Sequence, residues 1–168
     1  AKDGYTQELL KLQLHTQTFS RIYAACCHCF VPLVRHFVNT PIARQKDSVL
    51  KREIRPDGAP ALTYFQVLER RGDRALLALK LATGRTHQIR VHMASIGWPL
   101  LGDFLYGQEE PDVIGRTALH SWHLSFLHPI TGGKLEFTIP PPADFTALFP
   151  HYRYPDPATL DFGKDTSC

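Results

Sequence analysis

The spacing of apolar residues between positions 83 and 107 predicts a short helix with well-marked ends. Ile89, Met93 and Ile96 recur at intervals of four and three residues, which places them on one face of a helix. Thr86 precedes this run and suits an N-cap, because its hydroxyl can accept a hydrogen bond from a free backbone N–H. The glycine and proline that follow the run suit its end. We therefore expect a helix over Thr86–Ile96.

Alternating apolar and polar positions predict two β-hairpins. The first joins residues 61–69 to residues 74–81 through a turn at Arg71-Gly72-Asp73. Its second strand is apolar on both faces, so we expect it to be central in a sheet. The second hairpin joins residues 119–127 to residues 134–139, and strict alternation along it puts three residues on one face: Trp122, Leu124 and Phe126.

The other segments are less regular. Residues 3–15 favour a helix that Thr6 could cap, and residues 20–31 favour a strand. Residues 34–60 hold several turn-forming residues and are expected to be mostly irregular. A last short helix is expected at Asp144-Phe145, followed from residue 150 by a mobile or loosely docked tail.

Composition and charge set broad limits on the chain. It has 168 residues, 43% hydrophobic and 21% charged, with a formal net charge of +3, which suits one globular unit and permits a polyanionic partner. No apolar run approaches the roughly 20 residues of a membrane span, so we expect no membrane partner. Three of the four cysteines, Cys26, Cys27 and Cys29, fall in one predicted strand, which argues against a disulfide framework and favours the cytoplasm. We expect no metal, because neither these cysteines nor the three histidines between positions 120 and 128 have ligand spacing.

A basic segment precedes the first hairpin. Five basic residues stand against Asp47 and Glu53, a local charge of +3, and they are Arg44, Lys46, Lys51, Arg52 and Arg55. The segment is either a solvated loop or an arm that contacts phosphates and supplies sequence-independent affinity for nucleic acid.

Two further features carry candidate chemistry. Polar residues crowd the two turns of the predicted helix, including Arg85, His87 and Arg90; they are either solvated surface residues or groups that face a docked ligand. Free backbone N–H groups at the helix start, beside Arg85, could hold a phosphate. Tyr23 is expected to share a strand face with small residues, as a core tyrosine or as a platform for a planar group.

These motifs resemble a known family. The run TGRTHQIRVHMASIGWPLLGDFLYG, from Thr83 to Gly107, closely resembles a segment of the RluA-type RNA pseudouridine synthases. Arg21-Ile22-Tyr23 is similar to their K-x-Y motif, with arginine in place of lysine. The resemblance extends from the first residues to about Phe145. It implies an α+β fold, with a mostly antiparallel mixed sheet and flanking short helices, in which residues 1–149 are the C-terminal part of a catalytic domain and residues 150–168 a tail.

The resemblance also implies an activity, isomerisation of uridine to pseudouridine in ribosomal or transfer RNA, with no cofactor. Tyr23 would pack on a flipped base, and Arg90 would pair with a catalytic aspartate and lower its pKa. Arg85, His87 and the five basic residues of the arm would contact RNA. Asp103 belongs to the family's LLGD element, which shapes a loop, and is not expected to be the nucleophile.

The family's HRLD motif, which carries the nucleophilic aspartate, is absent from these 168 residues. We therefore expect a truncated catalytic domain that is inactive alone, with an exposed sheet edge that favours poor solubility or pairing with another chain. Two alternatives remain: a non-catalytic RNA-binding module that has lost the nucleophile, and a structural fragment without RNA affinity.

Overall fold

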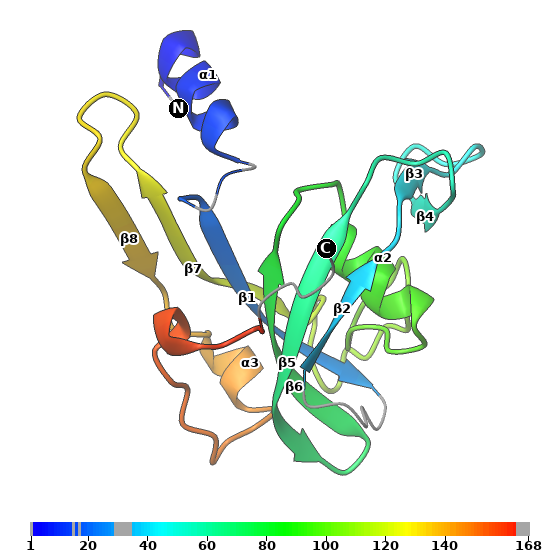
Figure 1. Ribbon diagram of the computed structural model, residues 1–168. Helices are drawn as coiled ribbons and strands as arrows, with labels where there is room; N and C mark the ends of the chain where they lie inside the picture. The colour runs from blue at the N-terminus through cyan, green and yellow to red at the C-terminus, as the bar shows by residue number, and fades with distance from the viewer. Residues whose placement is uncertain (1, 15, 17, 29–34, 164–168) are drawn as a thin grey trace.

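The computed structural model describes residues 2–14, 16, 18–28 and 35–163, which form an antiparallel sheet with short helices (Figure 1). The strand order in the main sheet is β2-β5-β6-β1-β7-β8, and β3 and β4 form a separate two-stranded ribbon. The elements are α1 Gly4–Gln13, β1 Ser20–His28, β2 Arg35–Asn39, β3 Ile42–Arg44, β4 Arg52–Ile54, β5 Leu62–Arg71, β6 Arg74–Leu81, α2 Gln88–Ser95, β7 Leu119–Leu127, β8 Lys134–Thr138, α3 Ala143–Thr146 and the 3-10 turn η1 Pro157–Thr159. The predicted α+β class is confirmed, and every described strand pair is antiparallel.

Both predicted hairpins form. β5 pairs with β6 across the turn at Gly72-Asp73, and β7 pairs with β8. β6 lies between β5 and β1, and its residues 75–79 are fully buried. The continuous apolar run of β6 therefore reflects a central strand that packs on both faces.

The two faces of the sheet carry separate core clusters. On one face, Cys26 and Leu76 pack with Phe145, Phe149 and Phe162 from the C-terminal part of the chain. On the other face, Cys27 and Leu77 pack with Ile89 and Met93 of α2. Both Cys26 and Cys27 are buried, and neither forms a disulfide with another of the described residues. β1 and β6 thus contribute to both cores, with alternate residues on opposite faces.

The segment after residue 150 is packed rather than loose. Tyr152 and Tyr154 pack against the first cluster, and Phe162 is buried in it. Asp161 pairs with Arg35 of the edge strand β2 at 2.6 Å. The expectation of a loosely docked tail is therefore wrong for residues 150–163, because aromatic side chains spaced along this segment fill the uncovered face of the sheet. Residues 164–168 lie outside the described part.

Several local expectations also differ from the structure. α1 is capped by Asp3, whose carboxylate accepts from the Thr6 N–H at 2.8 Å, and not by Thr6. Residues 35–60 are mostly irregular, as expected, but they also contain the three short strands β2, β3 and β4. Trp122 packs in the first cluster, whereas Phe126 stacks on Phe137 across the β7–β8 pair. A register shift between Ile22 and Tyr23 in the β1–β7 pair interrupts the strict alternation that the prediction assumed.

Within the described residues, no helix has the length and apolar character needed to cross a membrane. The histidines of the second hairpin have ordinary structural partners. His120 Nε2 lies 2.9 Å from the Ile139 carbonyl, and His123 Nδ1 lies 2.9 Å from the Thr138 hydroxyl. His128 Nδ1 accepts from the backbone N–H groups of Ile130 and Thr131. All three are therefore satisfied by their own hairpin.

Candidate functional site

Gln88 links the start of α2 to strand β5 by hydrogen bonds. Its side-chain amide donates to the Leu62 carbonyl and to the Thr63 hydroxyl, both at 3.0 Å. Its carbonyl oxygen accepts from the Thr83 hydroxyl at 2.8 Å and from the Arg85 N–H at 2.9 Å. Gln88 is buried, so these four bonds satisfy groups that would otherwise be costly to bury. Gln88 is therefore a structural residue and not a ligand contact.

His92 completes this attachment one turn later. Its Nε2–H donates to the Thr40 carbonyl at 3.0 Å, so Nδ1 accepts from the Thr63 hydroxyl at 2.9 Å. Burial lowers the pKa of His92, and the Thr40 bond offsets only part of this effect. The imidazole is therefore neutral at neutral pH. Gln88 and His92 thus face the sheet. Arg90 and His87, by contrast, have no hydrogen bond to any described residue of β5.

Arg90 forms a bidentate pair with Asp103. Its Nε lies 2.8 Å from Oδ2 and its Nη2 lies 2.6 Å from Oδ1. Asp103 has no exposed surface, and its Oδ1 also accepts from the N–H groups of Leu105 and Tyr106. Burial alone would raise the pKa of Asp103, but the Arg90 pair and the backbone donors outweigh it and lower the pKa below its ordinary value. Asp103 is therefore an ionised, fully bonded positioning group.

The turn that carries Asp103 depends on the glycine before it. Gly102 has a φ of +65°, and a Cβ at this position would overlap the carbonyl of Arg116. A side chain therefore has neither the backbone conformation nor the space it would need. The LLGD element shapes a loop, as the resemblance implied, and it also presents the carboxylate that holds Arg90.

Two aromatic rings flank the Arg90 guanidinium. Its central carbon lies 5.1 Å from the ring centroid of Tyr106 and 5.4 Å from that of Phe104. The Arg90 side chain is only 13% exposed, whereas Phe104 is 59% exposed. Nη1 makes no hydrogen bond to any of the described residues, so this donor remains available at the edge of a desolvated cation. Sequence analysis did not select Phe104 and Tyr106, although both lie within the GDFLYG end of the motif.

Tyr106 also connects the site to the basic ribbon. Its hydroxyl accepts from the Arg52 N–H at 2.8 Å and lies 3.0 Å from His87 Nδ1. The tautomer of the His87 imidazole decides which of these two groups donates the proton of their hydrogen bond. Burial, followed by the charges of Arg90 and Arg52, lowers the pKa of His87. His87 is thus a neutral hydrogen-bonding group.

His87, and not Thr86, occupies the N-cap position of α2. It has a φ of +56° and makes no side-chain cap bond, and the helix begins at Gln88. The predicted Thr86 cap and the predicted start of the helix are therefore wrong. Non-glycine residues rarely adopt this conformation, and such strain is often found at functional sites. In this conformation, the His87 side chain is hydrogen-bonded to the Tyr106 hydroxyl.

Tyr23 lies on β1, on the sheet face that α2 covers. It is half-buried and packs against the cluster that contains Ala25 and Cys27, as its predicted face requires. Cys29, the third predicted neighbour, lies outside the described residues. Arg21, two positions earlier, donates to the Thr83 carbonyl at 3.3 Å, and its guanidinium fills the space beside Gly84. Arg21, which sequence analysis recognised as a substituted motif position, thus contacts the loop that leads to α2.

The basic arm is an ordered ribbon beside α2, at the end of the sheet shown at the upper right in Figure 1. Arg55 pairs with Glu53 at 3.3 Å and also with Asp57, so its charge is largely committed. Arg44 donates to the Val49 carbonyl, and Lys46 and Lys51 are exposed. Arg85 donates through Nε to the Pro60 carbonyl at 3.0 Å. The structure thus brings the ribbon, His87 and Arg90 together through Tyr106.

Comparison with known proteins identifies the family. The family described as RNA pseudouridylate synthase matches residues 1–95. The chain is 43% identical to an uncharacterized RNA pseudouridine synthase of Bacillus subtilis (strain 168), YjbO, over 88% of this chain and 52% of the relative. It is also 43% identical to ribosomal large subunit pseudouridine synthase D of Vibrio parahaemolyticus, over 66% of this chain and 38% of the relative.

Solved structures agree with this assignment. Human RNA pseudouridylate synthase domain containing 1 superposes with a TM-score of 0.69 at 28% identity, over 83% of this chain and 60% of the human chain. Human RNA pseudouridylate synthase domain containing 4 has a TM-score of 0.66 at 20% identity, over 86% of this chain and 66% of that chain, and shares the fold. The chain spans about half the length of the curated relatives it matches. From its matched residues and relatives, this chain belongs to the RNA pseudouridylate synthase family.

Proposed function

We propose that this chain supplies the base-binding and arginine side of a site that isomerises uridine to pseudouridine in RNA. The single observation that supports the proposal most strongly is the buried Arg90–Asp103 pair, because it fixes a desolvated guanidinium whose Nη1 donors stay available. A protein that only bound phosphates would have little use for a cation held this way.

In this proposal, the uridine leaves its stack and packs on the half-buried ring of Tyr23. The nucleophile is the aspartate of the family's HRLD motif, which is not among these 168 residues. Arg90 donates to that carboxylate through Nη1, orienting it and keeping it ionised. Asp103 does not serve as the nucleophile, because both of its oxygens are occupied by Arg90 and Oδ1 also accepts from the backbone.

RNA contacts in this proposal extend from the site along the ribbon. His87 is neutral, so its imidazole would contact a base or a 2′-hydroxyl through Nε2 rather than neutralise a phosphate. Charge comes from Arg85 and from the five basic residues of the arm, Arg44, Lys46, Lys51, Arg52 and Arg55. The substrate we propose is ribosomal or transfer RNA in the cytoplasm; the name of the Vibrio relative supports the ribosomal choice.

We also propose that the edge of the sheet at β8 associates with another chain. β8 is the last strand of the sheet, and Phe137 and Ile139 at this edge are 50% and 60% exposed. Such an apolar edge is a template for pairing. Sedimentation should then show a concentration-dependent dimer, which a Phe137→Lys substitution removes; a monomer at all concentrations would exclude this association.

The function is tested by tritium release from RNA labelled with [5-³H]uridine. The 168-residue chain is compared with a chain extended upstream by a segment that carries the HRLD motif. We expect release only from the extended chain, and a loss of at least about a hundredfold in its Arg90→Ala variant, since an oriented charge in an active site is typically worth that much. Arg116→Ala removes an exposed bidentate arginine elsewhere and should change little.

Two other outcomes would refute parts of the proposal. Release from the 168-residue chain alone would mean that an acid within it is the nucleophile. If neither chain releases tritium from ribosomal or transfer RNA but both still bind RNA, the result would favour the non-catalytic RNA-binding module.

A further inference from the structure

The β5–β6 turn places two arginines directly opposite each other. Arg71 ends β5, Arg74 begins β6, and the two are cross-strand partners on either side of Gly72-Asp73. Like charges that face each other across a strand pair repel, which makes this an unfavourable arrangement for the hairpin alone. The arrangement therefore calls for a counter-charge.

Among the described residues, the partners of Arg71 and Arg74 are weak. Arg71 Nη1 lies 3.5 Å from the Leu148 carbonyl, at the limit of a hydrogen bond. Arg74 Nε lies 3.9 Å from Asp73, whose side chain is 77% exposed. The other oxygen of Asp73 lies 3.7 Å from His28 Nδ1. Both guanidiniums thus retain most of their donors.

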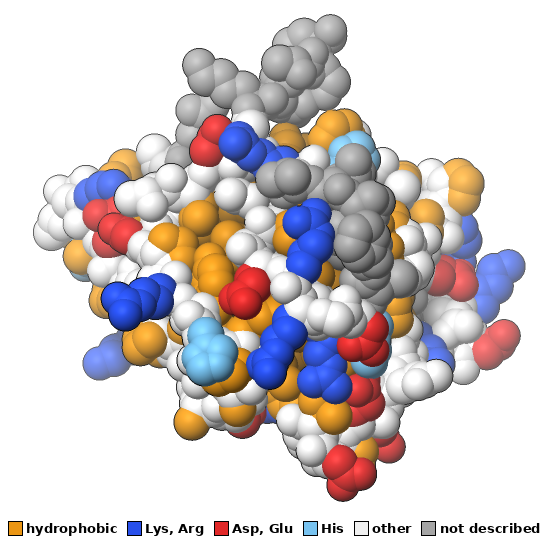
Figure 2. Space-filling view, turned by 90° about the horizontal axis from the view of Figure 1, so that it is seen from below, with side chains coloured by type: hydrophobic (Ala, Val, Ile, Leu, Met, Phe, Trp, Pro, Cys, Tyr) orange, Lys and Arg blue, Asp and Glu red, His pale blue; other side chains and the backbone are white. Residues whose placement is uncertain are grey.

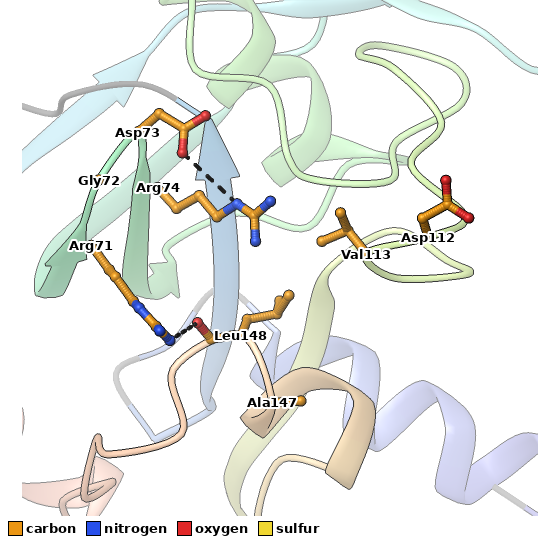
Figure 3. Close-up of a pocket in the computed structure, with 8 residues that line it drawn as sticks. All are labelled: Arg71, Gly72, Asp73, Arg74, Asp112, Val113, Ala147 and Leu148. Atoms are coloured by element: carbon orange, nitrogen blue, oxygen red, sulfur yellow. Dashed lines mark hydrogen bonds and ion pairs between the residues drawn. The ribbon is translucent and has the colours of Figure 1, made fainter.

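A cavity of about 510 Å³ opens between these arginines and the opposite loop. In Figure 3, the Arg74 guanidinium points from β6 toward Val113 across the cavity, and Arg71 runs along its lower side to Leu148. Asp112 lies on the far side, beyond Val113, away from both guanidiniums. Figure 2 views the molecule from this end, where Lys and Arg side chains gather beside Asp and Glu.

From this arrangement, we propose that the cavity between Arg71 and Arg74 binds a phosphate group. Two guanidinium groups that approach one space from adjacent strands match the oxygens of a phosphate, and the negative charge of the bound phosphate would offset the cross-strand repulsion. The phosphate belongs either to a free phosphate compound or to an RNA backbone, and only the second source rests on the proposed function. β6 has eight residues, so this cavity lies about 25 Å from the start of the loop that leads to α2.

The test is a titration of the 168-residue chain with inorganic phosphate, followed by NMR of the Gly72 amide and the Arg74 Nε–H. Sodium chloride keeps the ionic strength constant. We expect saturable shifts of both resonances, and about tenfold weaker binding in Arg74→Gln, the usual cost of losing a charged hydrogen-bond partner. Arg153→Gln removes an exposed arginine elsewhere and should bind as the parent chain does.

A variant with increased phosphate affinity shows that the affinity changes come from the site itself, because a folding defect would only weaken binding. Asp73→Asn removes the carboxylate that competes for Arg74, so it should bind phosphate more tightly by a few fold. Shifts that fail to saturate, or that change equally in Arg74→Gln and Arg153→Gln, would overturn the proposal.

The source of the phosphate is resolved by competition. If RNA displaces inorganic phosphate from the cavity, the occupant is a backbone phosphate. If phosphate binds and RNA does not compete, the occupant is a free phosphate compound. Neither result depends on uridine isomerisation, so a failure of the proposed function would leave this site standing.

Discussion

The carboxylate of Asp103 accepts two hydrogen bonds from one edge of the Arg90 guanidinium, from Nε at 2.8 Å and from Nη2 at 2.6 Å. This geometry settles two roles at once. The aspartate cannot attack a substrate while both of its oxygens are bonded, and the arginine can present only its remaining donors. Only a planar guanidinium can bind Asp103 along one edge and keep donors available on another. A lysine at position 90 would have the charge but not this geometry.

Removing the charge of Asp103 should destabilise the protein strongly. In Asp103→Asn, the buried guanidinium loses its counter-charge, so we expect the free energy of unfolding to fall by about 3 kcal/mol. Urea denaturation measures this loss. The matched control is Asp144→Asn, which breaks the exposed bidentate pair with Arg116 and should cost no more than about 1 kcal/mol. Equal losses in the two variants would contradict the positioning role.

Removing the hydroxyl of Tyr106 should loosen the ribbon without disturbing α2. Tyr106→Phe keeps the ring beneath Arg90 but leaves the Arg52 N–H without its acceptor. We expect amide hydrogen exchange at Arg52 to accelerate about fivefold to tenfold, which corresponds to the loss of one hydrogen bond. Exchange in α2 should be unchanged. Tyr5→Phe, at an exposed position, is the control, and an unchanged rate at Arg52 would show that the hydroxyl does not hold the ribbon.

Two glycines with similar backbone conformations should respond differently to alanine. Gly97 and Gly102 have φ values of +81° and +65°, so an alanine at either position would cost about 1 kcal/mol for adopting the left-handed conformation. A Cβ at Gly97 meets nothing within 4 Å, whereas one at Gly102 overlaps the Arg116 carbonyl. We expect Gly102→Ala to lower the melting temperature clearly more than Gly97→Ala. Equal shifts would mean that the turn adjusts freely.

Stability should fall between pH 7 and pH 5 because of His92. Its pKa is lowered in the folded state, mainly by burial, so the unfolded chain binds more protons as the pH drops below about 6.5. The stabilisation is thus present above that pH and is lost as the pH falls toward the folded-state pKa, with a slope of at most about 1.4 kcal/mol per pH unit for one proton.

Substitutions test whether His92 causes this slope of the unfolding free energy against pH. In His92→Gln, the dependence of the unfolding free energy on pH should flatten, while His151→Gln, at an exposed position, should keep the parent slope. His87 shares the direction of the shift and would account for a remaining slope. Asp103 does not contribute in this window, because its lowered pKa moves its effect below about pH 3.8. An unchanged slope in His92→Gln would contradict the assignment.

The hairpins were predictable from local alternation and turn residues, and the central position of β6 was predictable because the strand is apolar on both faces. The roles of the polar residues in α2 were not. Gln88 and His92 look like ligand contacts in sequence, since only the approach of β5 and of Thr40 supplies their partners. Similarly, the C-terminal segment packs on one face of the sheet, and no local sequence pattern shows that this face needs a cover. Tyr106 lies in a motif, but its three contacts join segments far apart along the chain.

The C-terminal segment also affects how the chain can fold as it is synthesised. Phe145, Phe149 and Phe162 close one face of the sheet, while α2, which closes the other, ends at Ser95. A ribosome therefore releases the α2 side long before the aromatic residues of the opposite side exist. Until they emerge, the cluster around Cys26 and Leu76 lacks its three phenylalanines, so the nascent sheet exposes apolar surface that favours association.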